Sequence, residues 1–321
     1  MTETIVVLDA ISETVADRLR ALLPEGFALT HATALGDDHL TDIVAQADYA
    51  ISGQVAVGGA VLRAAKRLKL LHKWGVGVDN LDIDTARELG VKVARTTGSN
   101  ATAVAEFTIG LMICALRHIP HGHFDLQQGK WRNWRGQTPF LLSGKMVGLV
   151  GFGAIGKAVA RLLSGFGCTI LYHKPHRLSG DEEARLGVVF AELPDLLARA
   201  DAVSLHCPLT PATAGLIDRA ALTAMKSTAV LINVARGGVV AEDDLAWALS
   251  AGVIHSAAVD VYEIEPLPAD SPLLHLDNLT LTPHLGAMAA DTFEPTVRRM
   301  FANIARVSRG EPLPALDAVV P

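Results

Sequence analysis

The chain has 321 residues, of which 50% are hydrophobic and 19% charged, so it holds enough apolar material for two packed domains and lacks the composition of a disordered chain. Its formal net charge of -6 provides no basic surface, and we expect neither nucleic acid nor a membrane as a partner. Residues 107–115, the longest strongly apolar stretch, are too few to span a bilayer, and the first residues lack a signal-peptide pattern. We therefore expect a cytoplasmic protein.

Short strand-like segments alternate with helical ones in the first hundred residues. The predicted strands are residues 5–8, 49–51, 70–74 and 91–94. This alternation predicts a parallel sheet with helices on both faces and with ligands at the carboxyl ends of the strands. Gly75-Val76-Gly77 lies at one such end.

A long helix is predicted over residues 101–116, and a polar, tryptophan-bearing arm over residues 118–143 follows it. A second series then has six predicted strands, at residues 146–150, 168–172, 202–206, 229–234, 256–261 and 279–282. The last helix, residues 289–308, has no sheet left to continue, so we expect it to pack on the first domain. The predicted fold class is α/β with two doubly wound domains, in which a Rossmann domain (99–287) is inserted in a flavodoxin-like domain (1–98 and 288–321).

A glycine fingerprint opens the second series. Gly151, Gly153 and Gly156 lie in Gly-Phe-Gly-Ala-Ile-Gly, directly after a predicted strand and before an amphipathic helix. In that position glycines let the backbone approach a pyrophosphate, which the helix N-terminus stabilises. The alternative is a glycine-rich structural turn.

The end of the next strand differs from the usual NAD pattern, in which an acidic residue binds the ribose hydroxyls. Here His173 stands at the acidic position, with Lys174 and Arg177 close behind. Cations in place of a carboxylate suit a 2′-phosphate, which favours NADP over NAD. The alternative is a solvated basic turn in an NAD enzyme.

Three later predicted strands are each followed by an ionisable residue: Arg236 in Asn-Val-Ala-Arg-Gly-Gly, Glu265 in Glu-Ile-Glu-Pro-Leu-Pro, and His284 in Thr-Pro-His-Leu-Gly. With the glycine fingerprint and Gly-Val-Gly-Val-Asp-Asn (75–80) upstream, these motifs stand in the order of a known family. The chain closely resembles the D-isomer-specific 2-hydroxyacid dehydrogenases over nearly its whole length, and most of all the glyoxylate/hydroxypyruvate reductase branch.

The resemblance implies an oxidoreductase in which NAD(P)H reduces a small 2-keto acid to the D-2-hydroxy acid. His284 would supply the proton, Glu265 would bind its other ring nitrogen, and Arg236 would bind the carboxylate and polarise the keto oxygen. The backbone N–H groups of Val76 and Gly77, in the substrate-binding domain, would hold the far side of the carboxylate. Taken singly, Arg236 also fits a surface ion pair, Glu265 a turn, and His284 a core histidine.

The resemblance also implies further cofactor contacts: Ala154, Ile155, His206, Cys207, Pro208, Val234, Ala235, Asp260, His284 and Gly286. Asp260 would bind the nicotinamide carboxamide, although a capping or turn role fits a strand end nearly as well. We expect no metal, because His118, His121 and His123 have no carboxylate or cysteine to complete a ligand set.

In the family, the segment matching residues 118–143 embraces a second subunit, so a homodimer is implied. Trp131 and Trp134 lie in the stretch from which hydroxypyruvate reductases project a tryptophan toward the partner's active site. Simple interface packing is the favoured alternative.

Three other functions stay open. Formate dehydrogenase shares the fold but has a glutamine where Glu265 stands, which counts against it. A phosphoglycerate dehydrogenase-like enzyme is an alternative, although a chain ending at Pro321 leaves no room for an appended regulatory domain. A non-catalytic, NAD(H)-responsive corepressor is the third, and we see no long disordered tail that would favour it.

Overall fold

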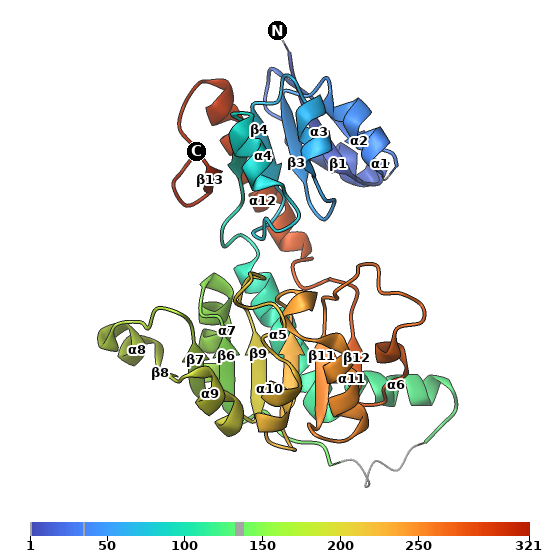
Figure 1. Ribbon diagram of the computed structural model, residues 1–321, viewed down its shortest axis with the longest axis vertical. Helices are drawn as coiled ribbons and strands as arrows, with labels where there is room; N and C mark the ends of the chain where they lie inside the picture. The colour runs from blue at the N-terminus through green and yellow to red at the C-terminus, as the bar shows by residue number, and fades with distance from the viewer. Residues whose placement is uncertain (1, 35, 132–137) are drawn as a thin grey trace. The chain divides into compact units, whose positions relative to one another are not determined.

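The computed structural model describes residues 2–34, 36–131 and 138–321 (Figure 1). The chain divides into two compact units. Unit 1 comprises Met1–Asn100 and Ala289–Pro321, and unit 2 comprises Ala101–Met288. The fold class is α/β, as predicted, and each unit contains one sheet.

Unit 1 has a six-stranded sheet in the order β13-β5-β4-β3-β1-β2. All neighbours are parallel except β13 and β5. The order 2-1-3-4-5 is that of a flavodoxin-like fold. The strands are β1 (Glu3–Ala10), β2 (Phe27–Ala32), β3 (Tyr49–Ser52), β4 (Leu70–Lys73), β5 (Lys92–Ala94) and β13 (Ala318–Val320).

The long C-terminal helix α12 (Ala290–Ser308) packs on one face of this sheet (Figure 1). Its buried residues Val297, Met300 and Phe301 share a core with strand residues of β1, β3 and β4. A second core involves three helices, α2 to α4. The remaining helices of unit 1 are α1 (Glu13–Arg20), α2 (Asp37–Val44), α3 (Gly59–Ala64) and α4 (Ile83–Glu88).

Unit 2 has a parallel sheet in the order β12-β11-β10-β9-β6-β7-β8. It has seven strands, so the prediction of six was wrong: the short edge strand β8 (Val188–Phe190) was missed. The chain changes direction between β6 and β9, and such a switch point is where doubly wound folds bind dinucleotides. The other strands are β6 (Met146–Val150), β7 (Thr169–His173), β9 (Ala202–Leu205), β10 (Val230–Asn233), β11 (Ser256–Val259) and β12 (Leu279–Leu281).

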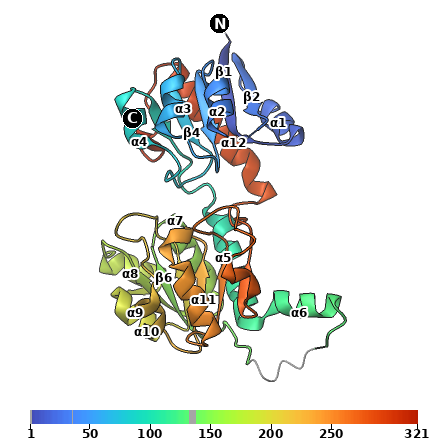
Figure 2. The same cartoon turned by 45° about the vertical axis from the view of Figure 1, so that its right-hand side comes forward.

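Helices cover both faces of this sheet and form two cores. One core includes α5 (Ala101–Arg117) and α7 (Ala154–Ser164), and the other includes α9 (Leu193–Arg199), α10 (Arg219–Ala224) and α11 (Glu242–Ser250). Figure 2 shows α6 (Ile119–Gln127) extending away from the rest of unit 2. The remaining elements are α8 (Gly180–Leu186), η2 (Gly237–Val239) and η3 (Pro272–His275).

Within the described ranges, no single helix is long and apolar enough to cross a membrane. Only α5 and α6 taken together reach the required length and composition, and they meet at an angle of 65°.

Candidate active site

The glycine fingerprint forms the connection between β6 and α7. Gly151 has φ +94°, and a Cβ there would overlap the backbone of His206 and Cys207 at the end of β9. A Cβ at Gly156 would lie 2.5 Å from the Gly151 carbonyl oxygen. At Gly153, the N-cap of α7, a Cβ would meet nothing within 4 Å, and no described side chain caps the helix. The loop therefore fits a pyrophosphate, because the free N–H groups at the start of α7 have no capping side chain among the described residues and can bind an anion.

The end of β7 carries the three residues predicted to bind a 2′-phosphate. His173 donates from Nδ1 to the Ala191 carbonyl oxygen at 3.1 Å. Lys174 is half-buried. Arg177 forms a two-pronged ion pair with Glu183 at 2.8 Å for each contact, and this guanidinium, with the Tyr172 hydroxyl, lowers the pKa of Glu183 to about 2. Arg177 is thus already bound to a carboxylate that the sequence interpretation did not identify.

The end of β9 brings two of the predicted cofactor residues against the glycine loop. His206 Nε2 lies 3.0 Å from the Ser204 hydroxyl, while Nδ1 has no hydrogen-bond partner among the described residues. Burial lowers the pKa of His206 to about 3 and raises the pKa of the Cys207 thiol to about 11. A neutral imidazole and a protonated thiol are therefore the forms present near neutral pH, and Cys207 is not a reactive thiolate.

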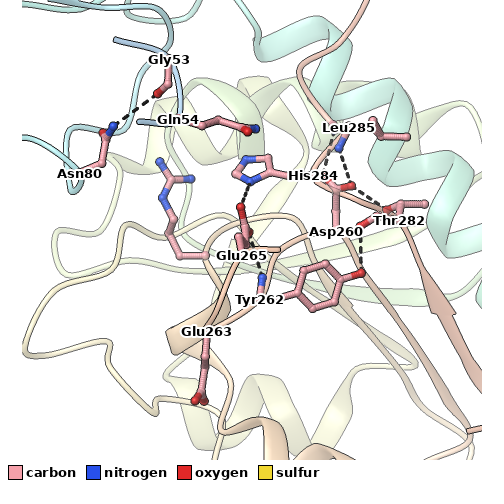
Figure 3. Close-up of polar contacts among 12 residues, drawn as sticks. Gly53, Gln54, Asn80, Asp260, Tyr262, Glu263, Glu265, Thr282, His284 and Leu285 are labelled. Carbon is pink, nitrogen blue, oxygen red and sulfur yellow. Dashed lines mark hydrogen bonds and ion pairs between the residues drawn. The ribbon is translucent and has the colours of Figure 1, made fainter. Parts of the chain in front are cut away.

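His284 and Glu265 form a hydrogen-bonded pair in the candidate site of unit 2 (Figure 3). His284 Nδ1 and Glu265 Oε2 are 2.7 Å apart, and the Tyr262 N–H donates to Glu265 Oε1 at 3.1 Å. Burial alone would raise the pKa of Glu265, but the hydrogen bonds from His284 and Tyr262 and the charges of His284 and Arg236 together lower it. Glu265 is therefore an ionised acceptor for Nδ1, and it does not engage the other ring nitrogen, Nε2.

The backbone of His284 has φ +53°, a left-handed conformation that few residues with side chains adopt. Asp260, at the end of β11, holds this turn in place. Its carboxylate accepts from the Leu285 N–H at 2.8 Å, the Gly286 N–H at 2.8 Å and the Thr282 hydroxyl at 2.6 Å. The Asp260 carbonyl oxygen also accepts from the His284 N–H at 2.9 Å. Asp260 is 2% exposed, so its carboxylate organises the turn that presents His284.

Arg236 follows β10, the strand next to β11. Its Nη1 donates to the Ala235 carbonyl oxygen at 2.7 Å, and the Asn233 side chain donates to the Arg236 carbonyl oxygen at 2.9 Å. Val234 and Ala235, also predicted cofactor contacts, are 9% and 7% exposed. Since β10, β11 and β12 are neighbours in one sheet, their ends bring Arg236, Glu265 and His284 together at one edge.

Val76 and Gly77 lie after β4 in unit 1. The Gly75 carbonyl oxygen accepts from the Thr96 N–H at 2.9 Å and the Thr96 hydroxyl at 3.1 Å, and Arg95 Nη1 lies 3.5 Å from the Val76 carbonyl oxygen. The carbonyl groups of Gly75 and Val76 are therefore bonded to residues 95–96 of the same unit.

The sequence interpretation missed Tyr262 and the pair formed by Glu242 and Glu263. Burial raises the pKa of Tyr262 to about 12, and its hydroxyl donates to the Thr282 carbonyl oxygen at 2.9 Å. Trp134 lies outside the described residues, and Trp131 is 88% exposed. In the described part of the chain, no three histidine, cysteine, aspartate or glutamate side chains cluster as metal ligands.

Known proteins resemble this chain in sequence and in fold. Residues 109–286 match the family model described as "D-isomer specific 2-hydroxyacid dehydrogenase, NAD binding domain". A hydroxypyruvate reductase of Thermotoga maritima is 37% identical over 261 residues, which cover 80% of this chain and 83% of the relative. A D-3-phosphoglycerate dehydrogenase of Mycobacterium tuberculosis is 37% identical over 313 residues, or 93% of this chain, but the chain spans only 58% of that relative's length.

Among solved structures, an NADPH-dependent glyoxylate/hydroxypyruvate reductase of Sinorhizobium meliloti, in complex with NADP and malonate, superposes with a TM-score of 0.85. It is 28% identical, and the match covers all of this chain and 97% of the other. The family model covers more than half of the chain and includes Arg236, Glu265 and His284. The chain belongs to the D-isomer-specific 2-hydroxyacid dehydrogenase family.

Proposed function

We propose that this protein reduces a small 2-keto acid, with glyoxylate or hydroxypyruvate favoured, to the D-2-hydroxy acid with NAD(P)H. The observation that carries the proposal is the pair of His284 and Glu265 at 2.7 Å, next to Arg236 at the edge of a dinucleotide-binding sheet. Relatives named hydroxypyruvate reductase and glyoxylate reductase support the substrate class.

The nicotinamide, when bound, supplies the hydride that the carbonyl carbon of the substrate accepts. The proton for the carbonyl oxygen comes from His284 Nε2, because Nδ1 is bonded to Glu265. Arg236 binds the substrate carboxylate and stabilises the charge that develops on the oxygen. For Val76 and Gly77, in unit 1, we retain the substrate-binding role of their N–H groups that the family resemblance implies.

We assign the cofactor pyrophosphate to Gly151, Gly153, Ala154, Ile155 and Gly156, and further cofactor contacts to His206, Cys207, Pro208, Val234, Ala235 and Gly286. Asp260 contributes by holding Gly286 in place. The loop fits a dinucleotide, since a Cβ at Gly151 or Gly156 would push the loop backbone out of place, and the space beside Gly153 is open.

NADP is the favoured cofactor, because the end of β7 carries His173 and Lys174 where a carboxylate would repel a 2′-phosphate. Arg177 joins this site only by exchanging Glu183 for the phosphate. We expect Lys174→Ala to lower kcat/KM for NADPH by roughly tenfold and to leave NADH unchanged. His176→Ala, at an exposed neighbouring position, is the matched control. Equal losses with both cofactors would contradict the assignment.

The direct test is the initial rate of reduction of glyoxylate, hydroxypyruvate, pyruvate and phosphohydroxypyruvate, each with NADPH and with NADH. Rapid turnover of glyoxylate or hydroxypyruvate that His284→Ala abolishes is the expected result. Turnover that survives His284→Ala would refute the assignment of the acid. No turnover on any pair, despite cofactor binding, would favour the corepressor-type binding protein.

A phosphoglycerate dehydrogenase-like activity is the second candidate, and the 37% identity over 93% of this chain favours it. Phosphohydroxypyruvate as the best substrate in the same assay would establish it in place of the first proposal.

A homodimer is proposed from the apolar surface of unit 2. A groove of about 900 Å³ is lined by residues of α5, α6, η3 and β12. Large apolar side chains around it are exposed: Ile119 by 52%, Phe124 by 60% and Leu274 by 45%. Exposed patches of this kind mark interfaces. We expect Phe124→Glu to yield monomers in light scattering, and an unchanged mass would contradict this.

A further inference from the structure

The turn that carries Glu265 is tied to the start of α11 by two glutamates. The Glu263 N–H donates to Glu242 Oε1 at 2.6 Å, and the Glu242 N–H lies 3.3 Å from Glu263 Oε1. Ala241, the N-cap of α11, has no side-chain oxygen to cap the helix. Glu263 supplies that cap from a distant segment, and in return Glu242 fixes the Glu263 backbone.

This tie acts next to the catalytic pair. Two successive N–H groups of the turn donate to carboxylates: that of Tyr262 to Glu265, and that of Glu263 to Glu242. From the other side, Gly237 packs so closely on the same turn that a Cβ there would overlap the Tyr262 carbonyl and the Glu263 nitrogen. Two contacts therefore hold the backbone of residues 262–263: the hydrogen bond from the Glu263 N–H to Glu242, and the close packing of Gly237.

The position of Glu242 is electrostatically unfavourable. Burial raises the pKa of the half-buried Glu242 carboxyl, the Glu263 N–H opposes that rise, and the neighbouring charges of Glu263, Asp243 and Glu265 raise it further. A carboxylate kept among other carboxylates beside a catalytic pair is more typical of a functional site than of a stabilising cap.

We propose that Glu242 is a positioning residue for the reaction proposed above: through the Glu263 N–H it holds the turn that presents Glu265 to His284. The inference rests on the proposed function. Without the tie, Glu265 samples other positions, and His284 loses the acceptor that orients its ring and retains its proton. The effect reaches the substrate only through Glu265 and His284, so Glu242 itself contacts no reacting atom.

The test compares Glu242→Ala, which removes the acceptor, with Glu242→Gln, whose amide oxygen can still accept the Glu263 N–H. Asp243→Ala is the matched control, since it removes a neighbouring exposed charge from the first turn of α11. We expect Glu242→Ala to lower kcat/KM for hydroxypyruvate by roughly tenfold and to move the alkaline midpoint of the pH–rate profile to lower pH. Glu242→Gln should keep at least about half of the rate, and Asp243→Ala should match the wild type.

A merely structural cap would lower the melting temperature of Glu242→Ala and leave kcat/KM and the pH midpoint unchanged, and that result would overturn the proposal. If the wild type turns over no keto acid, the proposed function fails by itself. The positioning role is then decided by the NMR titration of the His284 ring protons, whose midpoint should fall in Glu242→Ala and not in Asp243→Ala. An unchanged midpoint would overturn it.

Discussion

Replacing Glu265 by glutamine removes one charge from the catalytic pair and keeps an oxygen that can accept the His284 hydrogen bond. Two unit charges about 4 Å apart interact by roughly 4 kcal/mol at an effective dielectric constant of about 20. The His284 and Glu265 side chains are 32% and 33% exposed, and the Arg236 charge also acts on Glu265. Solvent screening therefore leaves about 1.5–3 kcal/mol for the charged hydrogen bond between the two side chains.

This energy corresponds to a factor of about 10 to 100 in rate. We expect Glu265→Gln to lower kcat/KM at neutral pH by that factor and to change the pH profile of keto acid reduction, because the carboxylate whose pKa the pair holds low is lost. The assay is the pH dependence of kcat/KM for hydroxypyruvate with saturating cofactor. Asp243→Asn is the control, because it removes an exposed carboxylate of the first turn of α11 and leaves the hydrogen bonds of Glu265 in place. A Glu265→Gln profile that superposes on the wild type would refute the proposed role of the charge.

Three further predictions follow from contacts and pKa shifts. Gly237→Ala should lower kcat/KM more than tenfold while cofactor affinity, measured by fluorescence titration, stays within about twofold, because the added Cβ overlaps the Tyr262–Glu263 backbone. Burial lowers the pKa of His72 from 6.5 to about 4, so the unfolded chain binds more protons between these values and this group alone costs the native state about 2 kcal/mol by pH 5; in urea unfolding, His72→Gln should lose about 2 kcal/mol less than the wild type on acidification, while the buried His206 keeps its own contribution. Alkylation of Cys207 at pH 8, followed by mass spectrometry, should be much slower in the folded protein than in urea, since burial raises the pKa of its thiol to about 11.

The sequence predicted the strands that are buried on both faces. All ten predicted strands are present within two residues of their predicted bounds, and β3, β4, β9, β10 and β11 are buried throughout. The missed strands β2, β8 and β13 lie at sheet edges. In β2 buried and exposed residues are mixed, while β8 and β13 have three residues each. An edge strand pairs on one side only, so its sequence carries less of the apolar pattern that identifies a strand.

In the candidate site, too, some features could be predicted from the sequence and others could not. Arg236, Glu265 and His284 could be predicted because each lies in the segment after an apolar strand and in a motif that stands in the family's order, and the ends of parallel strands meet at one edge. The pairing of Arg177 with Glu183 and of Glu242 with Glu263 could not. These pairs depend on which side chains meet across a turn, and Glu242 and Glu263 are 21 positions apart in sequence. A basic residue after a strand therefore predicted a phosphate site at Arg177, where the structure has an ion pair.

Asp260 follows an apolar strand, as the sequence predicts, but its hydrogen bonds to the turn at His284 are visible only in the structure. A left-handed residue with a side chain costs roughly 1–2 kcal/mol, and His284 adopts this conformation at the position where its ring binds Glu265. Three hydrogen bonds to a buried, charged acceptor offset that cost. The same three bonds place the Gly286 N–H and fix Thr282, whose carbonyl oxygen the Tyr262 hydroxyl binds. The geometry of the His284–Glu265 pair is therefore set from both sides, by the hydrogen bonds of Asp260 to the histidine turn and by the Tyr262–Glu263 backbone next to the glutamate. If the pair acts as proposed, changes at either support should lower turnover more than cofactor binding.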